Sequence, residues 1–450
     1  MRYTKVFTQS RFQTRAQNNF SVDNKEKSVF LGSRNETRQR SALVGKVFEH
    51  GKIANVLDYS LFCDVSFPHV IGIFGSRGSG KSFDLGVLIE GIFLSDNLTP
   101  SSVTDAAIVF DVQDQFWTLG YSPQASLEID QEQLRDLKRW GLEPCAIPNV
   151  KVLVPDESDT SVPNAKPFSL AADQLSVGDW LAILELERFS AMGQALLALL
   201  EEGGALPPGQ LADSCAGSVA MSRFQQATVD GLSWRLRGLE ASGVIKTKGL
   251  LIDELLRPGT LSVVLMRNLD EAVRGLIVGV ISRLVSDRMG RVQQARKVAL
   301  RTGSAAEDTS NLTGRLWMVL DEAHVLVPND GATAATVPLI DYVKRGRDAG
   351  LSLIFATQQP SAVNSKLMSQ VDLTFTHMLG FDADLNAAVA RMPTRSTIDY
   401  DVDNERASSI SDVIRSLGPG EAILADSSSG RVLVARIRPR VTAHGGATPK

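Results

Sequence analysis

The chain has 450 residues, of which 43% are hydrophobic and 22% charged, the ordinary composition of a soluble globular protein. At this length we expect two or three structural units rather than one core. The net charge of -4 excludes a protein that binds nucleic acid through a strongly basic overall charge, so any contact with DNA must come from local basic surface.

The cysteines and histidines give no sign of a metal site. Cys63, Cys145 and Cys215 are far apart and form no C-x-x-C pair, and the five histidines do not cluster with them. This distribution argues against a zinc site or a disulfide framework and fits a reducing compartment. Because no long uncharged apolar stretch follows the basic N-terminus or occurs later, we predict a cytoplasmic protein without a membrane span.

Two segments precede the first strong motif. Residues 1–41 hold nine Lys and Arg against three Asp and Glu, which indicates a basic polar N-terminal arm. Its simplest interpretation is a solvated arm, and the alternative is an arm that binds nucleic acid or a partner. Residues 42–68 carry loosely alternating apolar residues, which predicts a short β-rich lead-in.

Residues 69–154 show strands alternating with helical stretches. Strand patterns occur at Val70–Phe74, Ala106–Phe110 and Val150–Val154, and a helix pattern follows the first of them to about Leu94. Such alternation predicts an α/β fold in which helices cover both faces of a parallel sheet.

Residues 155–250 interrupt this alternation. The stretch Pro155–Pro167 is rich in Pro, Asp and Ser, and leucines recur at helical spacing from Ser169 to about Lys248. We therefore predict a helical insertion between two parts of one α/β core.

The α/β pattern resumes in residues 251–450. Apolar strand patterns lie at Leu261–Met266, Leu316–Leu320 and Leu351–Thr357, and two further strand patterns near the C-terminus predict a hairpin before the tail. This part is expected to complete the core.

A phosphate-binding loop is the strongest motif in the chain. It consists of Gly75, Ser76, Arg77, Gly78, Ser79, Gly80, Lys81 and Ser82. Glycines let consecutive N–H groups point at a β-phosphate, the lysine reaches the β- and γ-phosphates, and the last hydroxyl ligates Mg²⁺. The alternative is a glycine turn with an incidental lysine, but the strand before the loop and the helix after it favour nucleotide binding.

Two adjacent carboxylates, Asp321 and Glu322, follow the strand Leu316–Leu320. The carboxyl ends of strands form the edge at which ligands of α/β folds bind. We expect Asp321 to be an outer ligand of the Mg²⁺ held by Ser82, and Glu322 to be the general base that polarises the attacking water. The alternative is an ordinary Asp-Glu start of a helix, and the phosphate loop upstream favours the catalytic interpretation.

Gln358 and Arg347 are the remaining catalytic candidates. In NTPases with a catalytic Glu beside the Mg²⁺ aspartate, an additional strand lies between the loop strand and the acidic strand and carries a polar residue toward the γ-phosphate. Gln358, which follows the strand Leu351–Thr357, is predicted to be that sensor, and a polar turn is the alternative. Arg347 is our first choice for an arginine finger that reaches the γ-phosphate of a neighbouring subunit. The simpler interpretation is that Lys344, Arg345 and Arg347 only complement the helix dipole.

Together these motifs resemble the HerA branch of the HerA/FtsK superfamily of hexameric DNA-translocating ATPases, over residues from about 65 to 440. The matching segments are His69-Val70-Ile71 before the loop, Asp111 to Phe116, Leu269-Asp270-Glu271, Leu320 to His324, Gly346-Arg347, Ala356 to Ser361, and Pro419 to Ile423. The resemblance implies a RecA-like core with a helical insertion. It also implies that six subunits form a ring around double-stranded DNA and bind ATP and Mg²⁺ at their interfaces. The partner that it implies is a nuclease or NAD-hydrolase effector.

The chain departs from the family pattern in three places. HerA proteins usually carry a longer N-terminal β-barrel, whereas only the residues up to Phe74 precede the loop here, so that barrel is expected to be reduced. Arg345 replaces the family's acidic residue before Gly-Arg, and Gln359 stands where Arg is more usual. Both substitutions concern the region expected between subunits.

The leading hypothesis is a ring-forming, hexameric ATP hydrolase that couples hydrolysis to DNA translocation together with a nuclease or other effector. The alternative is a non-translocating ATPase scaffold that assembles and regulates such an effector in an antiphage defence complex. A second alternative, an FtsK or conjugation-type DNA pump, is disfavoured by the missing membrane segment. A GTPase is least favoured because no Asn-Lys-x-Asp tetrapeptide follows the loop.

Overall fold

The computed structural model describes most of the chain after the predicted arm. The described residues are 22–23, 25–33, 40–49, 55–95, 98–99, 103–156, 160–303, 311–393, 401–402, 405–406 and 410–445. Most of the arm predicted at 1–41 lies outside them. Its described part contains β1 (Val22–Asp23) and β2 (Ser28–Leu31).

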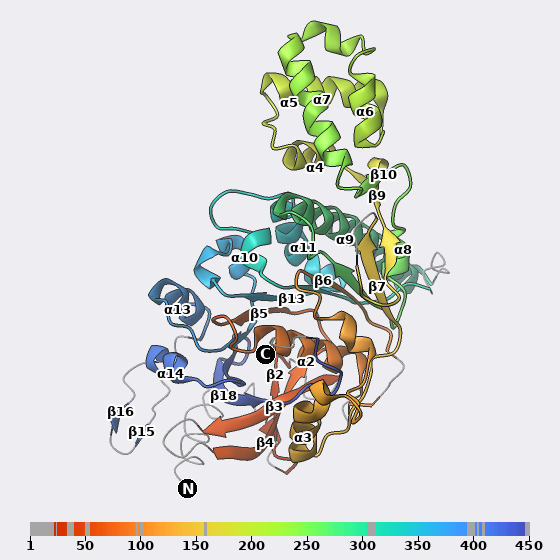
Figure 1. The fold of residues 1–450 in the computed structure, drawn as a ribbon. Helices are drawn as coiled ribbons and strands as arrows, with labels where there is room; N and C mark the ends of the chain where they lie inside the picture. The colour runs from red at the N-terminus through yellow and green to blue at the C-terminus, as the bar shows by residue number, and fades with distance from the viewer. Residues whose placement is uncertain are drawn as a thin grey trace.

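The centre of the molecule is a sheet whose described strands run in the order β1-β2-β4-β3-β18-β17-β14-β5-β13-β12-β6-β11-β7-β8 (Figure 1). From β14 to β8 every neighbouring pair is parallel. The bounds in this part are β14 (Leu373–Thr376), β5 (Val70–Phe74), β13 (Leu351–Thr357), β12 (Leu316–Leu320), β6 (Ala106–Asp111), β11 (Leu261–Leu265), β7 (Val150–Pro155) and β8 (Lys166–Phe168).

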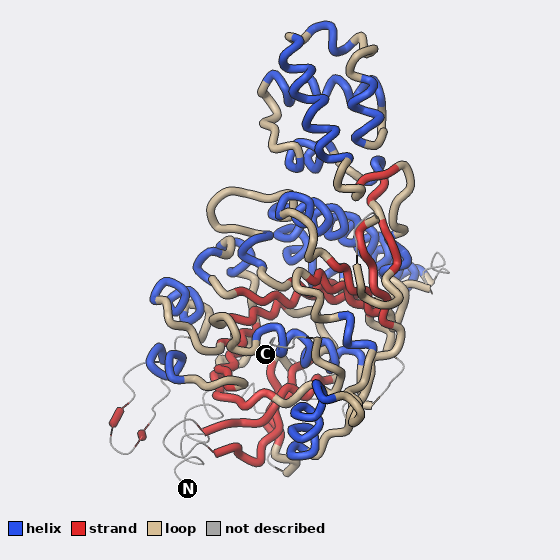
Figure 2. Tube along the Cα trace, in the orientation of Figure 1, coloured by secondary structure: helices blue, strands red, loops and turns tan. Residues whose placement is uncertain are grey.

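The strands of the parallel part are nearly continuous apolar runs because both of their faces are covered. Successive residues of β6 enter opposite hydrophobic clusters: Ile108 packs on the side of α9 (Glu271–Thr302) and Val109 on the side of α2 (Lys81–Phe93). The helix α11 (Thr336–Ala349) packs beside α9. The predicted parallel sheet with helices on both faces is therefore confirmed (Figure 2).

Beyond β14 the sheet continues with antiparallel strands. The predicted C-terminal hairpin is formed by β17 (Glu421–Asp426) and β18 (Arg431–Ile437). β18 pairs with β3 (Ser41–Glu49), which pairs with β4 (Asn55–Asp64), so the β-rich lead-in joins the central sheet. The close packing of α2 on β3 requires Gly91, because a Cβ there would lie 2.1 Å from the Cβ of Ala42.

Four helices form a lobe that stands apart from the sheet in Figure 1. They are α4 (Val177–Ile183), α5 (Ala191–Gly203), α6 (Pro208–Ser214) and α7 (Gln226–Glu240). Leu196, Leu211 and Leu232 are fully buried in the lobe, which explains the helical spacing of its leucines. The parallel pair β9 (Leu170–Ala171) and β10 (Ile245–Lys246) lies at its base. The domain boundaries themselves, 155–250 included, stay a prediction.

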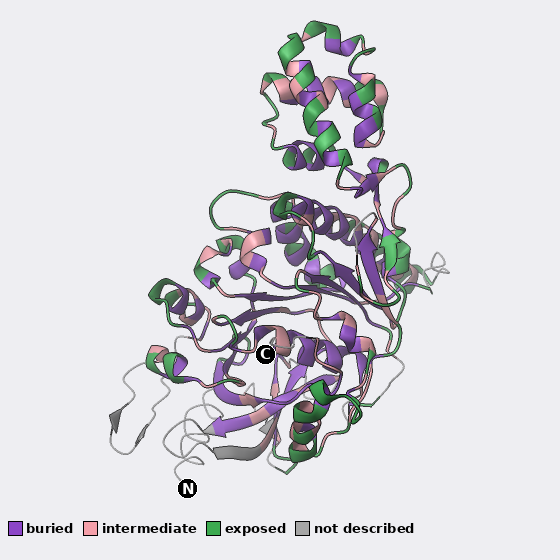
Figure 3. Ribbon diagram, viewed as in Figure 1, coloured by how far each residue is buried: buried purple, intermediate pink, exposed green. Residues whose placement is uncertain are grey.

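Short elements complete the described chain. They are α3 (Gln131–Trp140), α8 (Ile252–Leu255), α10 (Ala323–Leu326), α12 (Ser365–Met368), α13 (Asp382–Val389), α14 (Ile410–Ser416), β15 (Asp401–Val402), β16 (Glu405–Arg406), and 3-10 turns that include η2 (Trp117–Gly120). Burial is concentrated along the sheet and the inner sides of the helices, as Figure 3 shows. Within the described segments we find no helix with the length and apolar character that a membrane crossing requires.

Candidate nucleotide-binding site

The phosphate loop connects the carboxyl end of β5 to the N-terminus of α2. Gly78 and Gly80 have positive φ angles of 76° and 115°, which a residue with a side chain rarely adopts. Gly75 is needed for space, because a Cβ there would lie 2.4 Å from Ser79 Oγ. The loop is fixed to a neighbouring strand end, since the N–H of Ser76 donates to the carbonyl of Met378 at 2.9 Å. The sheet therefore fixes the curved conformation of the loop.

Two polar side chains of the loop are buried. Lys81 is buried, and its Nζ donates to the carbonyl of Ser76 at 2.9 Å, so the ammonium group lies across the loop. Burial lowers the pKa of Lys81 from its ordinary value, while the charges of Glu322 and Asp321 oppose that shift. Ser79 Oγ is buried and has no hydrogen-bond partner among the described residues. An acceptor such as a phosphate oxygen fits this arrangement of donors.

Asp321 and Ser82 lie together, as predicted, although they come from different elements. Asp321 follows β12, and Ser82 Oγ on the first turn of α2 donates to Asp321 Oδ2 at 3.2 Å. Burial, followed by the neighbouring charge of Glu322, raises the pKa of Asp321 to about 6. A hydroxyl and a carboxylate beside a phosphate loop are the oxygen ligands that Mg²⁺ prefers. No group of three or more His, Cys, Asp and Glu side chains in the described residues could hold a metal by itself.

Glu322 and Gln358 are also in contact. Gln358 Nε2 donates to Glu322 Oε1, while Glu322 Oε2 is buried and accepts no hydrogen bond from the described residues. His324 Nδ1 lies 3.4 Å from Oε2 and also contacts Thr357 Oγ1 at 3.1 Å. Glu322 adopts φ 53° and ψ 51°, a left-handed conformation that is uncommon for a residue with a side chain. One carboxylate oxygen is thus held in place, and the other remains able to accept a proton.

The position of these strands in the sheet explains why the side chains meet. β13, which leads to Gln358, lies between the loop strand β5 and the acidic strand β12. This is the order that the sequence analysis predicted. Since the three strands are parallel, their carboxyl ends bring the loop, the carboxylates and the glutamine to one edge.

A comparison with protein families identifies the chain. The model described as "Helicase HerA, central domain" matches residues 48–285, more than half of the sequence. The chain belongs to the HerA family. The predicted resemblance to the HerA/FtsK superfamily is therefore confirmed.

The fold of this HerA-family chain is similar to solved structures of P-loop ATPases. VirB4 of Thermoanaerobacter pseudethanolicus is 13% identical, with a TM-score of 0.50 over 89% of this chain and 97% of VirB4. The plasmid coupling protein TrwB in complex with ADP and Mg²⁺ is 14% identical, with a TM-score of 0.51 over 84% of this chain and 87% of TrwB. No curated protein sequence matches the chain. These likenesses confirm the predicted RecA-like P-loop fold.

Arg347 does not join the site of its own chain. It lies in the last turn of α11, just before β13 begins at Leu351, whereas the site lies after β13 ends at Thr357. Seven residues of extended strand separate the two sheet edges by roughly 20 Å. Arg345, the departure from the HerA pattern, forms an ion pair with Asp287 at 2.9 Å on the same far edge. The role of Arg347 at a neighbouring subunit stays a prediction.

Four residues of the pocket were not predicted from the sequence. The pocket beside the loop has a volume of 750 Å³, and Phe83, Gln113, Gln115 and His444 line it together with loop residues, Glu322 and Gln358. Gln113 and Gln115 follow β6, so their position after a strand end was a usable signal. No sequence pattern indicated His444, which lies outside every motif named above and far along the chain from the phosphate loop.

A buried contact between His377 and Asp84 supports the loop from behind. His377 follows β14, and its Nε2 lies 2.9 Å from Asp84 Oδ2 on α2, while its Nδ1 lies 3.0 Å from the carbonyl oxygen of Glu421. Both side chains are almost completely inaccessible. A Cβ at Gly75 would lie 2.8 Å from the Cβ of His377, so the histidine packs directly against the loop. His377 thus links the loop, α2 and the C-terminal hairpin.

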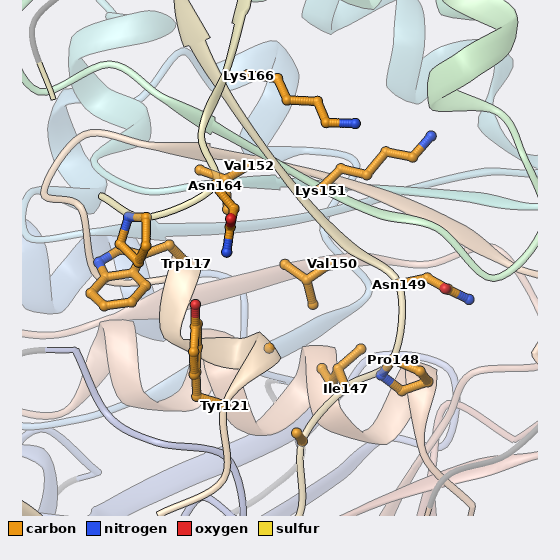
Figure 4. Close-up of a pocket in the computed structure, with 13 residues that line it drawn as sticks. Trp117, Tyr121, Ile147, Pro148, Asn149, Val150, Lys151, Val152, Asn164 and Lys166 are labelled. Atoms are coloured by element: carbon orange, nitrogen blue, oxygen red, sulfur yellow. The ribbon is translucent and has the colours of Figure 1, made fainter. Parts of the chain in front are cut away.

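A second pocket of 640 Å³ lies over β7 and η2 (Figure 4). On one side of it, Trp117 and Tyr121 pack edge to face with 5.5 Å between their ring centroids. The side chains of Lys151 and Lys166 extend on the other side. Its lining includes no carboxylate, histidine, cysteine or hydroxyl nucleophile of the kinds that catalyse hydrolysis, apart from the Tyr121 phenol. The first pocket is therefore the better candidate for an active site.

Proposed function

We propose that this HerA-family protein hydrolyses ATP to ADP and phosphate with the help of Mg²⁺. The observation that carries the proposal is the pairing of Glu322 with Gln358 next to the loop and the Ser82–Asp321 contact. TrwB, which shares the fold, forms a complex with ADP and Mg²⁺, which supports the same ligands here. Bound Mg²⁺ supplies charge neutralisation at the transferring phosphoryl group.

Each side chain has a defined task in this proposal. Lys81 exchanges its contact with the Ser76 carbonyl for phosphate oxygens, and Ser82 and Asp321 hold Mg²⁺. Glu322 Oε2 accepts the proton of the attacking water, because Oε1 is already occupied by Gln358. Gln358 fixes the direction of the carboxylate and faces the γ-phosphate. Lys81, Glu322, Gln358 and Arg347 are thus the proposed catalytic residues.

We further propose that the active form is a hexameric ring. Support comes from membership of the HerA family and from the position of Arg347, which is exposed on the sheet edge far from its own pocket. A neighbouring subunit could therefore receive it. In such a ring, ATP would bind between subunits, and assembly would govern hydrolysis.

The proposed work of the ring is translocation of double-stranded DNA together with a nuclease or other effector. The second candidate is a scaffold that assembles and regulates a nuclease or NAD-hydrolase effector in antiphage defence without moving DNA. The net charge of -4 favours this candidate, because a DNA motor needs a basic channel that the overall charge does not provide. The third candidate is a DNA pump of the conjugation type.

Two variants test the hydrolase proposal. Lys81→Ala should abolish both ATP binding and phosphate release, whereas Glu322→Gln should keep ATP bound while phosphate release falls by about a thousandfold. Phosphate release and retention of radiolabelled ATP on a filter measure the two steps separately. Normal turnover in both variants would contradict the proposal.

DNA separates the two leading candidates. A motor should hydrolyse ATP faster with double-stranded DNA and displace a protein roadblock from it. A scaffold should be indifferent to DNA and respond to its effector instead. The same phosphate-release assay, run with and without a linear duplex, distinguishes these results.

A further inference from the structure

Residues 438–445 run along α2 in the opposite direction to the helix. At the C-terminal end of α2, Glu90 accepts hydrogen bonds from Arg438 Nη1 at 2.6 Å and from the Thr442 N–H at 2.9 Å. Nearer the middle of the helix, Arg440 packs so closely that a Cβ at Gly86 would lie 2.7 Å from its Nε. At the first turn, His444 contacts the ring of Phe83. The segment thus ends beside the phosphate loop.

Contacts on its other side fix this 438–445 segment. Gln133 Nε2 on α3 donates to the carbonyls of Arg440 and Thr442, both at 2.7 Å. The N–H of Ala443 donates to the carbonyl of Tyr121 at 2.8 Å. The side chains of Arg438 and Arg440 are fully buried. The position of His444 is therefore determined by a network of buried polar contacts and not by its own packing alone.

The hydrogen bonding of His444 defines which ring nitrogen carries the proton. Arg440 Nη1 lies 3.2 Å from His444 Nδ1, and a guanidinium group can only donate. Nδ1 is therefore the acceptor, which places the proton of the neutral ring on Nε2. Burial and the charge of Arg440 lower the pKa of His444 to about 4, so the ring is neutral at physiological pH. A neutral ring can pack against another flat ring without a charge to desolvate.

His444 lines the same pocket as the phosphate loop, beside the first turn of α2. Lys81 and Ser82 mark the positions for the β- and γ-phosphates and for Mg²⁺. Phe83 is the next residue of α2. Its ring packs edge to face against that of His444, with 5.6 Å between the ring centroids. His444, Phe83 and Gln115 line the same pocket as Glu322. A nucleotide with its phosphates in the loop must continue in this direction with its ribose and base.

We propose that the 438–445 segment builds the base-binding end of the pocket and that His444 packs its ring against the nucleobase of ATP. This inference rests on the proposed function, because it takes the phosphates to lie in the loop. It makes His444 a binding residue that contributes affinity for the nucleoside part alone. The base end is thereby supplied by a segment far from the phosphate loop in sequence.

The test compares the binding of a nucleotide with the binding of pyrophosphate, which has phosphates but no ribose or base. Binding of ADP and of inorganic pyrophosphate, each with Mg²⁺, is measured by titration calorimetry on the full chain. His444→Ala should lower the affinity for ADP about tenfold, which is the effect of losing one stacking contact with a base. It should change the affinity for pyrophosphate by less than about twofold. His444→Phe should keep ADP affinity within about threefold, because it retains a flat ring. Lys138→Ala, on the exposed surface of α3, is the control and should bind both as the wild type does.

The outcomes separate this inference from the proposed function. If His444→Ala binds ADP as tightly as the wild type, or loses ADP and pyrophosphate equally, the inference is overturned. A His444→Phe variant that loses as much ADP affinity as His444→Ala would overturn it as well. Lys81→Ala should lose both ligands. If it binds both normally, the phosphate-loop assignment fails instead.

Discussion

The two ends of the nucleotide pocket are built in different ways. The phosphate end is made of strand ends and one loop: Gly75 to Ser82 after β5, Asp321 and Glu322 after β12, and Gln358 after β13. The opposite end depends on His444, which a buried ion pair between Glu90 and Arg438 helps to position. Parallel strands bring their carboxyl ends to one edge, so the first end follows from strand order, whereas the second requires long-range packing.

Because the two ends are built from different parts of the chain, a substitution at one end should leave the other end intact. Substitutions at the phosphate end should remove chemistry and leave the fold intact. Substitutions under the 438–445 segment should affect stability and nucleoside affinity together. The following experiments test this division.

The largest effect is expected from Arg347, which would complete the phosphate end from a neighbouring subunit. Arg347→Ala should lower ATP turnover by about a thousandfold, because an arginine finger neutralises charge in the transition state. Mixing Arg347→Ala subunits with Lys81→Ala subunits should restore part of the activity, since each supplies what the other lacks. Phosphate release from the mixture measures this.

Lys344→Ala is the control for that experiment, because Lys344 is exposed on the same helix. It should hydrolyse ATP normally. If rings still form but ATP turnover in the mixture does not recover, Arg347 does not act between subunits. Another residue must then complete the phosphate end.

The next effect concerns the support of the base end. Glu90→Gln keeps the shape of the side chain but leaves the buried Arg438 and Arg440 without their counter-charge. We expect the free energy of unfolding to fall by about 3 kcal/mol, the cost of breaking a buried ion pair. Urea denaturation followed by circular dichroism measures it.

The exposed pair of Arg139 and Asp136 on α3 provides a matched comparison, since exposed ion pairs contribute little. Asp136→Asn should change the free energy of unfolding by less than about 0.5 kcal/mol. If Glu90→Gln were equally mild, the buried network would not be what fixes the 438–445 segment.

A smaller effect is expected from Gln358, which contacts the proposed general base Glu322. Gln358→Ala should lower kcat by about thirtyfold and leave the KM for ATP nearly unchanged, because it frees Glu322 to move without altering the loop. Steady-state phosphate release gives both constants. Gln370→Ala, an exposed glutamine, is the control. An increase in KM alone would indicate that Gln358 binds ATP rather than orienting Glu322.

The smallest effect is a pH dependence at Asp321. Its pKa is raised to about 6 by burial, so the metal-free carboxyl is protonated below that pH and ionised above it. Protons therefore compete with Mg²⁺ below pH 6, and affinity for Mg²⁺ should fall about tenfold per pH unit there. Titrating Mg²⁺ against thermal stability at constant ADP, between pH 5 and 7.5, measures the slope. The same slope in Asp321→Asn would exclude Asp321 as its cause.

Sequence patterns alone were enough to predict the parallel sheet, the phosphate loop, the Asp321–Glu322 pair, Gln358 and the resemblance to HerA proteins. These are local patterns: apolar runs that fit strands covered on both faces, and short motifs whose residues act through the adjacent backbone. Even the placement of β13 between β5 and β12 followed from the pattern, because the motifs have a fixed order in this fold.

Only the tertiary structure decided the rest of the site. It placed His444 beside Phe83 and His377 against Asp84, contacts between residues about 300 or more positions apart. It also joined β3 and β4 to the central sheet through β18 and put Arg347 on the edge far from its own pocket. The position of His444 depends on how the buried charges of Glu90, Arg438 and Arg440 are satisfied together. No single stretch of sequence contains that information, because a buried charge is stable only where distant partners meet it.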